Sequence, residues 1–137
     1  KIKKNMEFTI VGNDIEINKF SNDKRISVKG IISNEKELIK IYDDHNIFIL
    51  PSFTEGYSMV IDEALSRLRP VIIFEEIKHI IGNRKGIFVS KRDQKNLLNT
   101  INYISSNYET ILTDIKKNSF ISKKKFVENI YKNLSNL

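Results

Sequence analysis

The sequence predicts an α/β protein in which a Rossmann-like parallel sheet is flanked by helices. Short runs of β-branched and aromatic residues alternate with stretches of helical periodicity, an order typical of repeated βα units. Three of the runs are almost continuously apolar, as are strands covered on both faces of a parallel sheet. The chain has 137 residues, which suits one compact unit. We therefore expect a single domain over residues 1–137.

The apolar runs define five expected strands. They cover residues 7–11, 26–29, 47–50, 71–74 and 86–89. A domain of this class normally has a further βα unit before its first strand here, and no earlier run supplies one. We therefore expect the chain to be a piece of a longer protein that lacks this first unit.

Four helices are expected between and after the strands. The first begins with Ser33 as its cap and places one apolar stripe inward, formed by Leu38, Ile41, Tyr42 and His45. The second covers about residues 58–67 and the third about 93–105. The last covers about 108–134, with a break near Asn118 and Ser119.

Composition excludes several classes of site. The chain has no cysteine and two histidines far apart, so a disulfide framework, a cysteine nucleophile and a multi-histidine metal centre are not expected. The net charge is +6, but isoleucine, lysine and asparagine dominate the whole sequence, which indicates a general bias towards lysine. No basic-aromatic reader motif accompanies the charge, so nucleic acid is not an expected partner.

The expected location is the cytoplasm. No apolar run reaches the roughly 18 residues that a membrane-spanning helix needs. The tail carries lysines beside apolar residues, at Lys116, Lys117 and 123–125. Peripheral contact with the cytoplasmic face of a membrane therefore stays open, although a helix that packs back on the domain explains the same pattern.

The loop after the strand at 47–50 and the helix that follows it carry the expected chemistry. Parallel sheets bind ligands at the carboxyl ends of their strands. Here Pro51 and Ser52 end the strand, and Glu55 precedes Gly56, where the backbone can approach a ligand closely. Tyr57, Ser58 and Met59 open the helix, whose free backbone N–H groups favour an anion such as phosphate. Glu63 lies one turn further in, where its carboxylate can accept hydrogen bonds from a ribose diol.

This segment resembles the retaining glycosyltransferases of the GT-B class known as group 1 or family 4. The family has a strand ending in Pro-Ser, then Glu-Gly-Phe and Glu-Ala, with seven residues between the two glutamates. Here Pro51-Ser52, Glu55-Gly56-Tyr57 and Glu63-Ala64 take those places, and Pro70-Val71-Ile72 matches the following strand. The resemblance extends over roughly residues 7–105.

The resemblance implies the C-terminal, donor-binding half of a two-domain hexosyltransferase-type enzyme. Such an enzyme transfers a sugar from a UDP- or GDP-sugar to a glycan or lipid-linked acceptor, with retention of configuration and without a metal or other cofactor. Glu63 would hold the ribose, and Glu55, the candidate catalytic residue, would lie near the donor sugar. The other donor-binding candidates are Gly56, Tyr57, Ser58, Met59, Pro51 and Ser52. The acceptor would be bound mainly by the missing N-terminal half, so this fragment alone is expected to be inactive.

Three departures from the family pattern bear on this interpretation. The family places Gly or another small residue two positions before the proline at 70, where this chain has Leu68. In the family, the loop after the strand at 71–74 commonly contains a Gly-Gly pair. In this chain, residues 75–80 of that loop are Glu-Glu-Ile-Lys-His-Ile. The family's phosphate-binding arginine and lysine belong to the expected βα unit that is absent before the first strand. Lys78, Arg84 or Lys85 could replace them.

A second interpretation therefore stays open, in which the chain is a non-catalytic Rossmann-like module that has lost donor binding. The sequence leaves the sugar, the nucleotide base, the acceptor and the oligomeric state undetermined. It also leaves open whether the loop at 75–80 still binds donor phosphate.

Overall fold

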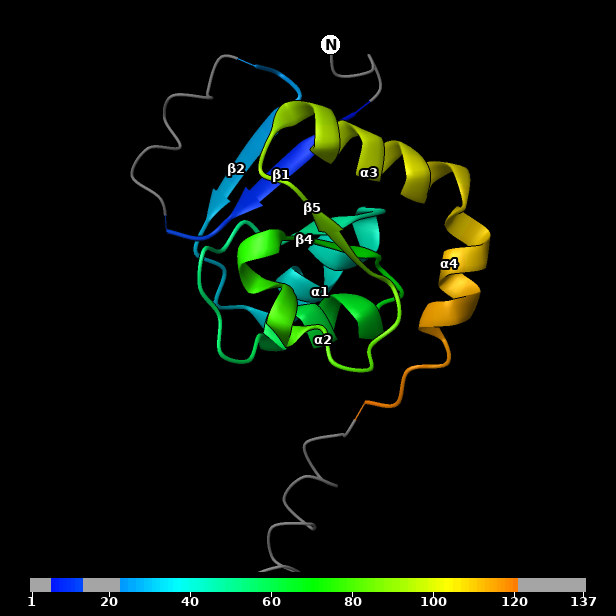
Figure 1. The fold of residues 1–137 in the computed structure, drawn as a ribbon. Helices are drawn as coiled ribbons and strands as arrows, with labels where there is room; N and C mark the ends of the chain where they lie inside the picture. Colours follow the sequence, from blue (N-terminus) through cyan, green and yellow to red (C-terminus); the bar gives the residue numbers. More distant parts are fainter. Residues whose placement is uncertain (1–5, 14–22, 121–137) are drawn as a thin grey trace, which may run out of the picture. The chain divides into compact units, whose positions relative to one another are not determined.

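The computed structural model describes residues 6–13 and 23–120, which fall into two compact units, 1–46 and 47–137. Both units combine parallel strands with helices (Figure 1). The predicted α/β class with parallel strands and flanking helices is thereby confirmed. The expected strands pair in two sheets, one in each unit, instead of one continuous ladder.

The first unit contains two parallel strands and a helix. Strand β1 covers Phe8–Val11, strand β2 covers Ile26–Gly30 and helix α1 covers Glu35–Asp44. The predicted cap at Ser33 is wrong by one residue. Asn34 is the N-cap, and its side-chain oxygen accepts a hydrogen bond from the backbone N–H of Glu37 at 3.2 Å, because asparagine is as good a cap as serine.

The imidazole of His45, just after α1, connects that helix to β1. Its Nδ1 donates to the carbonyl oxygen of Ile41 at 2.7 Å, and its Nε2 lies 2.8 Å from the hydroxyl of Thr9. A carbonyl oxygen can only accept, so Nδ1 carries a proton. His45 thus has a structural role in the first unit.

The second unit is built around a three-stranded parallel sheet in the order β3-β4-β5. The strands cover Phe48–Ile49, Val71–Phe74 and Ile87–Ser90. All four residues of β4, the central strand, are buried, as its unbroken apolar run predicts. The other two strands lie at the edges and are only half-buried along most of their length.

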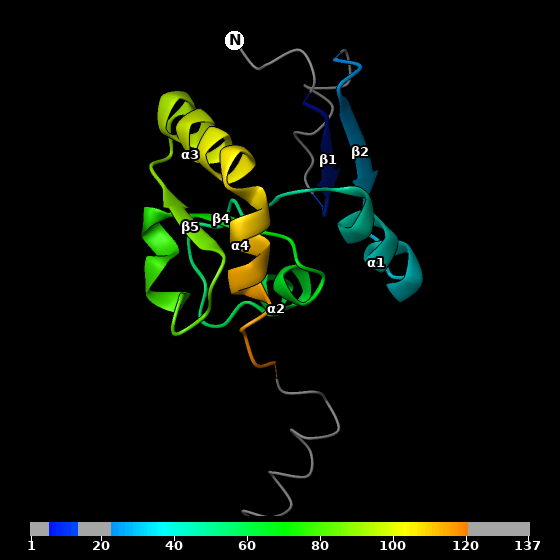
Figure 2. The ribbon, with the colours of Figure 1, turned by 90° about the vertical axis from the view of Figure 1, so that its right-hand side faces the viewer.

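Helices complete the core of the second unit. Helix α2 (Met59–Ser66) packs against β4, and α3 (Gln94–Ser106) packs against β5 and contacts α4 (Tyr108–Ile115). Figure 2 shows α4 continuing from the end of α3. The fully or almost fully buried core side chains include Ile61, Leu65, Ile72, Ile73, Ile77, Ile104 and Ile115.

Helix α2 ends in a turn that explains one departure from the family pattern. The backbone N–H of Leu68 bonds to the carbonyl of Leu65, and that of Arg69 bonds to the carbonyl of Ala64, both at 2.9 Å. These two bonds form a Schellman motif, which places its C′ residue in the left-handed region. That residue is Leu68, with φ of 57°. Glycine adopts this conformation more easily, which gives a physical reason for a small residue at this position.

Two further expectations require correction. The segment after β4 is not an open loop but a 3₁₀ helix, η2 (Glu75–Ile80), kinked at Ile77, because Ile77 and Ile80 are buried. The tail helix ends at Ile115, before the expected break at Asn118. The continuation expected up to 134, with the lysines at 123–125, lies outside the described residues.

Candidate functional site

Three connections meet at the carboxyl ends of the strands in the second unit. The loop from Pro51 to Ser58 follows β3, helix η2 follows β4, and residues 91–93 follow β5. Because the strands are parallel, these connections leave the same edge of the sheet. This is the edge at which open parallel sheets bind ligands.

Arg92 joins all three connections. Its guanidinium donates to the backbone carbonyls of Pro51 and Ser52, each at 3.0 Å, and forms an ion pair with Glu76 of η2, with Nε 3.1 Å from Oε1. The same group lies 3.8 Å from the ring centre of Phe53 and 4.2 Å from that of Phe74. The ion pair lowers the pKa of Glu76 through the hydrogen bond from Arg92.

The Arg92 network was missed by the sequence reasoning. A single arginine between a strand and a helix cap belongs to no periodic pattern. In a chain so rich in lysine, one more basic residue also does not stand out. The available signal was its position, two residues after the end of β5 and directly before Asp93, whose side chain caps α3 by accepting from the backbone N–H of Asn96 at 2.9 Å.

Glu55 is held at two points. One carboxylate oxygen, Oε1, accepts a hydrogen bond from the hydroxyl of Ser52 at 2.8 Å, and the backbone carbonyl accepts one from Nε2 of His79 at 2.9 Å. The other carboxylate oxygen, Oε2, makes no hydrogen bond with the described part of the chain. The structure therefore brings Ser52, Glu55 and His79 together and leaves one acceptor oxygen of Glu55 available.

The start of α2 is only partly open. Tyr57 and Met59 are both 68% exposed, whereas Ser58 between them is 3% exposed. Ser58 occupies the N-cap position, but its side chain makes no capping hydrogen bond. Ser58 therefore begins the helix without capping it through its side chain. The residues on either side of the cap are thus exposed, whereas the cap residue itself is buried.

A second polar cluster holds the first turn of α2. The hydroxyl of Tyr57 donates to the carboxylate of Asp62, and Nη1 of Arg84 bonds to Asp62 Oδ1 at 2.9 Å. The hydrogen bond to Asp62 is the main cause of the raised pKa of Tyr57. Arg84 also donates to the carbonyl oxygens of Ile80 and Ile81. Its guanidinium is thus already used to hold the turn after η2 against α2.

The remaining predicted site residues lie on the same loop and helix. Glu63 is half-buried in the middle of α2, one turn beyond Met59. Gly56 is exposed, its φ lies outside the left-handed region, and a Cβ added to it would meet no atom within 4 Å. Pro51 is exposed and supplies a carbonyl to Arg92.

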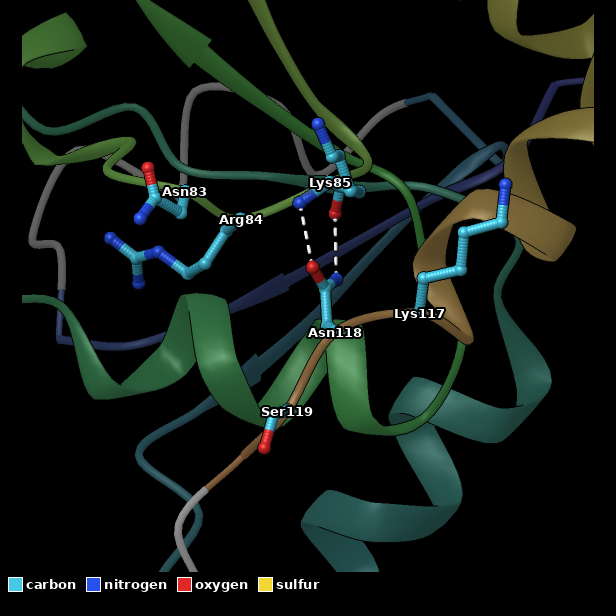
Figure 3. A pocket seen from close by; sticks show the side chains of 6 residues that line it. All are labelled: Asn83, Arg84, Lys85, Lys117, Asn118 and Ser119. Carbon is cyan, nitrogen blue, oxygen red and sulfur yellow. Dashed lines mark hydrogen bonds between the residues drawn. The ribbon is translucent and has the colours of Figure 1, made fainter.

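A hollow of ≈ 320 Å³ lies between residues 83–85 and 117–119 (Figure 3). Asn118 forms one of its sides and makes two hydrogen bonds with the backbone of Lys85, at 2.7 and 2.9 Å. Lys117 is paired with Asp114 at 2.6 Å. Since Lys85 precedes β5 and Arg92 follows it, the backbone that Asn118 holds lies at the other end of that strand from the candidate site.

No helix within 6–13 and 23–120 is long and apolar enough to cross a membrane. In the same residues, no three side chains of the types that bind metals come together as a candidate metal site.

The fold and the site are those of an α/β protein whose parallel strands end at a loop that carries a fixed glutamate and leads into a helix. A sequence model of the group 1 glycosyl transferases matches residues 1–107. The chain therefore belongs to the group 1 glycosyltransferase family. No curated protein matches it.

Proposed function

We propose that this chain is the nucleotide-sugar-binding, C-terminal part of a retaining GT-B glycosyltransferase. In this proposal the donor is a UDP- or GDP-sugar, no metal takes part, and the acceptor is a glycan or a lipid-linked glycan bound mainly by another domain. Family membership supports sugar transfer as the reaction class. The observation that carries the donor site is the fixed carboxylate of Glu55, with its free Oε2 at the carboxyl edge of the sheet.

Each site residue has a role in this proposal. Glu55 accepts hydrogen bonds from hydroxyls of the donor sugar through Oε2. Backbone N–H groups from Gly56 to Met59 stabilise the negative charge of the diphosphate, both in the bound donor and as it leaves. Glu63 accepts hydrogen bonds from the ribose hydroxyls one turn deeper. Pro51 and Ser52 shape the loop, and Ser52 also orients Glu55.

Thermal unfolding with nucleotides tests the proposal. UDP, GDP, UDP-glucose and GDP-mannose are added separately, and a ligand that binds only the folded state stabilises it by about 2.7 kcal/mol at a hundredfold excess over Kd. We expect stabilisation by one base, and its loss in Glu63→Gln. Glu109→Gln, at an exposed glutamate on α4, is the matched control and should behave like the wild type.

Gly56→Ala offers a sharper test of close backbone approach. The added methyl group meets open space in the free protein, and the backbone angle needs no glycine, so we expect unfolding to change little. If the donor lies against Gly56, the methyl group obstructs it and nucleotide-sugar affinity falls by about tenfold or more, equivalent to roughly 1.4 kcal/mol. Unchanged affinity would contradict the placement of the donor.

The second candidate function is a non-catalytic module that has lost donor binding. It is favoured by η2, which places the carboxylates of Glu75 and Glu76 in its first turn beside the candidate site. Acidic groups there disfavour a bound diphosphate, although Arg92 neutralises Glu76. Absence of stabilisation by all four nucleotides, in a protein that unfolds cooperatively, would favour this function.

A further inference from the structure

We propose that Arg92 is a positioning residue that fixes the loop carrying Glu55 and so sets where that carboxylate meets the donor sugar. The consequence for the sugar rests on the proposed function. The fixing of the loop rests on the described contacts alone.

The guanidinium of Arg92 is almost fully used by its surroundings. Arginine offers five N–H donors in a rigid plane. Nη1 donates to the carbonyl of Pro51 and Nη2 to that of Ser52, while Nε and Nη2 donate to the two carboxylate oxygens of Glu76 at 3.1 and 3.4 Å. Four N–H donors thus connect the end of β3 with η2, which follows β4. The two acceptors on the loop are consecutive carbonyls, so the backbone orientation at this turn is defined.

Two aromatic rings hold the plane of the guanidinium. Phe74, at the end of β4, is buried, whereas Phe53, on the loop, is 69% exposed. Arg92 lies against both, within 4.2 Å of each ring centre. An exposed phenylalanine has little other reason to hold one position, so the contact with Arg92 anchors the loop at a third residue. Lysine lacks both the fork of donors and the flat face.

The effect reaches Glu55 through Ser52. Arg92 holds the carbonyl of Ser52, and the hydroxyl of the same residue donates to Glu55 Oε1 at 2.8 Å. His79 holds the carbonyl of Glu55 from the other side. With Arg92 removed, the described hydrogen bonds from residues 51–55 to other connections would reduce to the His79 bond, and the direction of Oε2 would be less well fixed.

Hydrogen exchange on the ligand-free full chain tests the fixing of the loop. We expect Arg92→Ala to raise amide exchange in residues 52–57 by about tenfold or more, while the amides of β4 stay protected. Arg92→Lys should give nearly the same increase, and it is the second variant should the alanine form fold poorly. Lys91→Ala, which removes the neighbouring exposed side chain, is the control. Exchange in 52–57 that is unchanged in both Arg92 variants would overturn the proposal.

Binding measurements then test the consequence for the sugar. If wild-type protein binds UDP or GDP, we expect Arg92→Ala to retain most of that affinity but to lose the additional affinity for the corresponding nucleotide sugar. Millimolar guanidinium should restore part of this difference, and the same concentration of ammonium should not. An equal loss for nucleotide and nucleotide sugar would overturn the positioning role.

The two proposals fail in different ways. Binding of no nucleotide by the wild type refutes the proposed function, while faster loop exchange in the Arg92 variants would still support fixing of the loop. Normal nucleotide-sugar affinity in Arg92→Ala refutes the positioning of Glu55, while the proposed function stands.

Discussion

The two ends of the sheet in the second unit are built differently. At the amino end, Gly86 packs tightly against aliphatic side chains: a Cβ added to it would lie 2.7 Å from Cδ1 of Ile115 and 3.2 Å from Cδ2 of Leu65. At the carboxyl end, the guanidinium of Arg92 joins loops through hydrogen bonds to carbonyls and to Glu76. From this difference we expect substitutions at the amino end to change stability, and substitutions at the carboxyl end to change ligand binding.

The largest expected effect that sharpens this comparison is at Gly86. Its φ is +86°, and an added methyl group would collide with Ile115. Backbone strain and overpacking each cost roughly 1–3 kcal/mol, so we expect Gly86→Ala to lower the free energy of unfolding by about 2–4 kcal/mol in denaturant titration. Nucleotide affinity of the folded fraction should not change, and a selective loss of affinity would break the comparison.

Asn118→Ala should have a smaller effect at the same end. The substitution removes both hydrogen bonds to the backbone of Lys85, each of which contributes about 0.5–1.5 kcal/mol. We expect a loss of about 1–2 kcal/mol in the free energy of unfolding. Asn99→Ala, at an exposed position on α3, should leave stability nearly unchanged and serves as the control.

At the carboxyl end, acid should weaken the ion pair between Glu76 and Arg92 and so loosen the loop. The pKa of Glu76 is lowered in the folded state by Arg92, so the ion pair contributes stability above the unfolded pKa of a glutamate. That contribution is lost as the pH falls through the lowered value. We expect the protection factors of the amides in residues 52–57, each the ratio of the intrinsic to the measured exchange rate at the same pH, to fall below about pH 4 in the wild type. In Glu76→Gln these protection factors should be lower at neutral pH and less dependent on acid, and identical pH profiles would contradict the role of the pair.

The smallest expected effect concerns Leu68, at the amino end, where a substitution is expected to raise the free energy of unfolding instead of lowering it. Glycine removes the penalty of about 1–2 kcal/mol for a left-handed residue with a side chain, and adds about 0.5–1 kcal/mol of backbone entropy. The side chain of Leu68 is half-buried, which reduces the net gain. We therefore expect Leu68→Gly to raise the free energy of unfolding by about 0.5 kcal/mol, measured by thermal denaturation, without changing nucleotide affinity.

Much of the fold followed from local patterns. The apolar run at 71–74 is the buried central strand, and the helix expected from about residue 93 begins at Gln94, with Asp93 as its cap. The pattern could not give the 3₁₀ helix η2, because its segment has no helical stripe and is shaped by burial of Ile77 and Ile80. It also could not show that the strands pair in two sheets, since pairing depends on contacts distant in the sequence.

The candidate site was predictable as a segment but not as a network. The position of Glu55 at a strand's carboxyl end followed from the order of strand, turn and helix. Its partners His79 and, through Ser52, Arg92 come from two other connections, and no spacing links them. The predicted roles of Glu55 and Glu63 toward a donor remain predictions that the binding experiments test.

The amide of Asn118 has a consequence for how this protein meets other copies of itself. Strand β5 lies at the border of its sheet, and such borders can recruit a strand from another molecule. Gly86 turns its carbonyl toward Val71 of β4, so the N–H and C=O of the preceding Lys85 face away from the sheet. Asn118 occupies both groups (Figure 3). A single side chain thereby occupies the two backbone groups that an incoming strand would need at this point of the border.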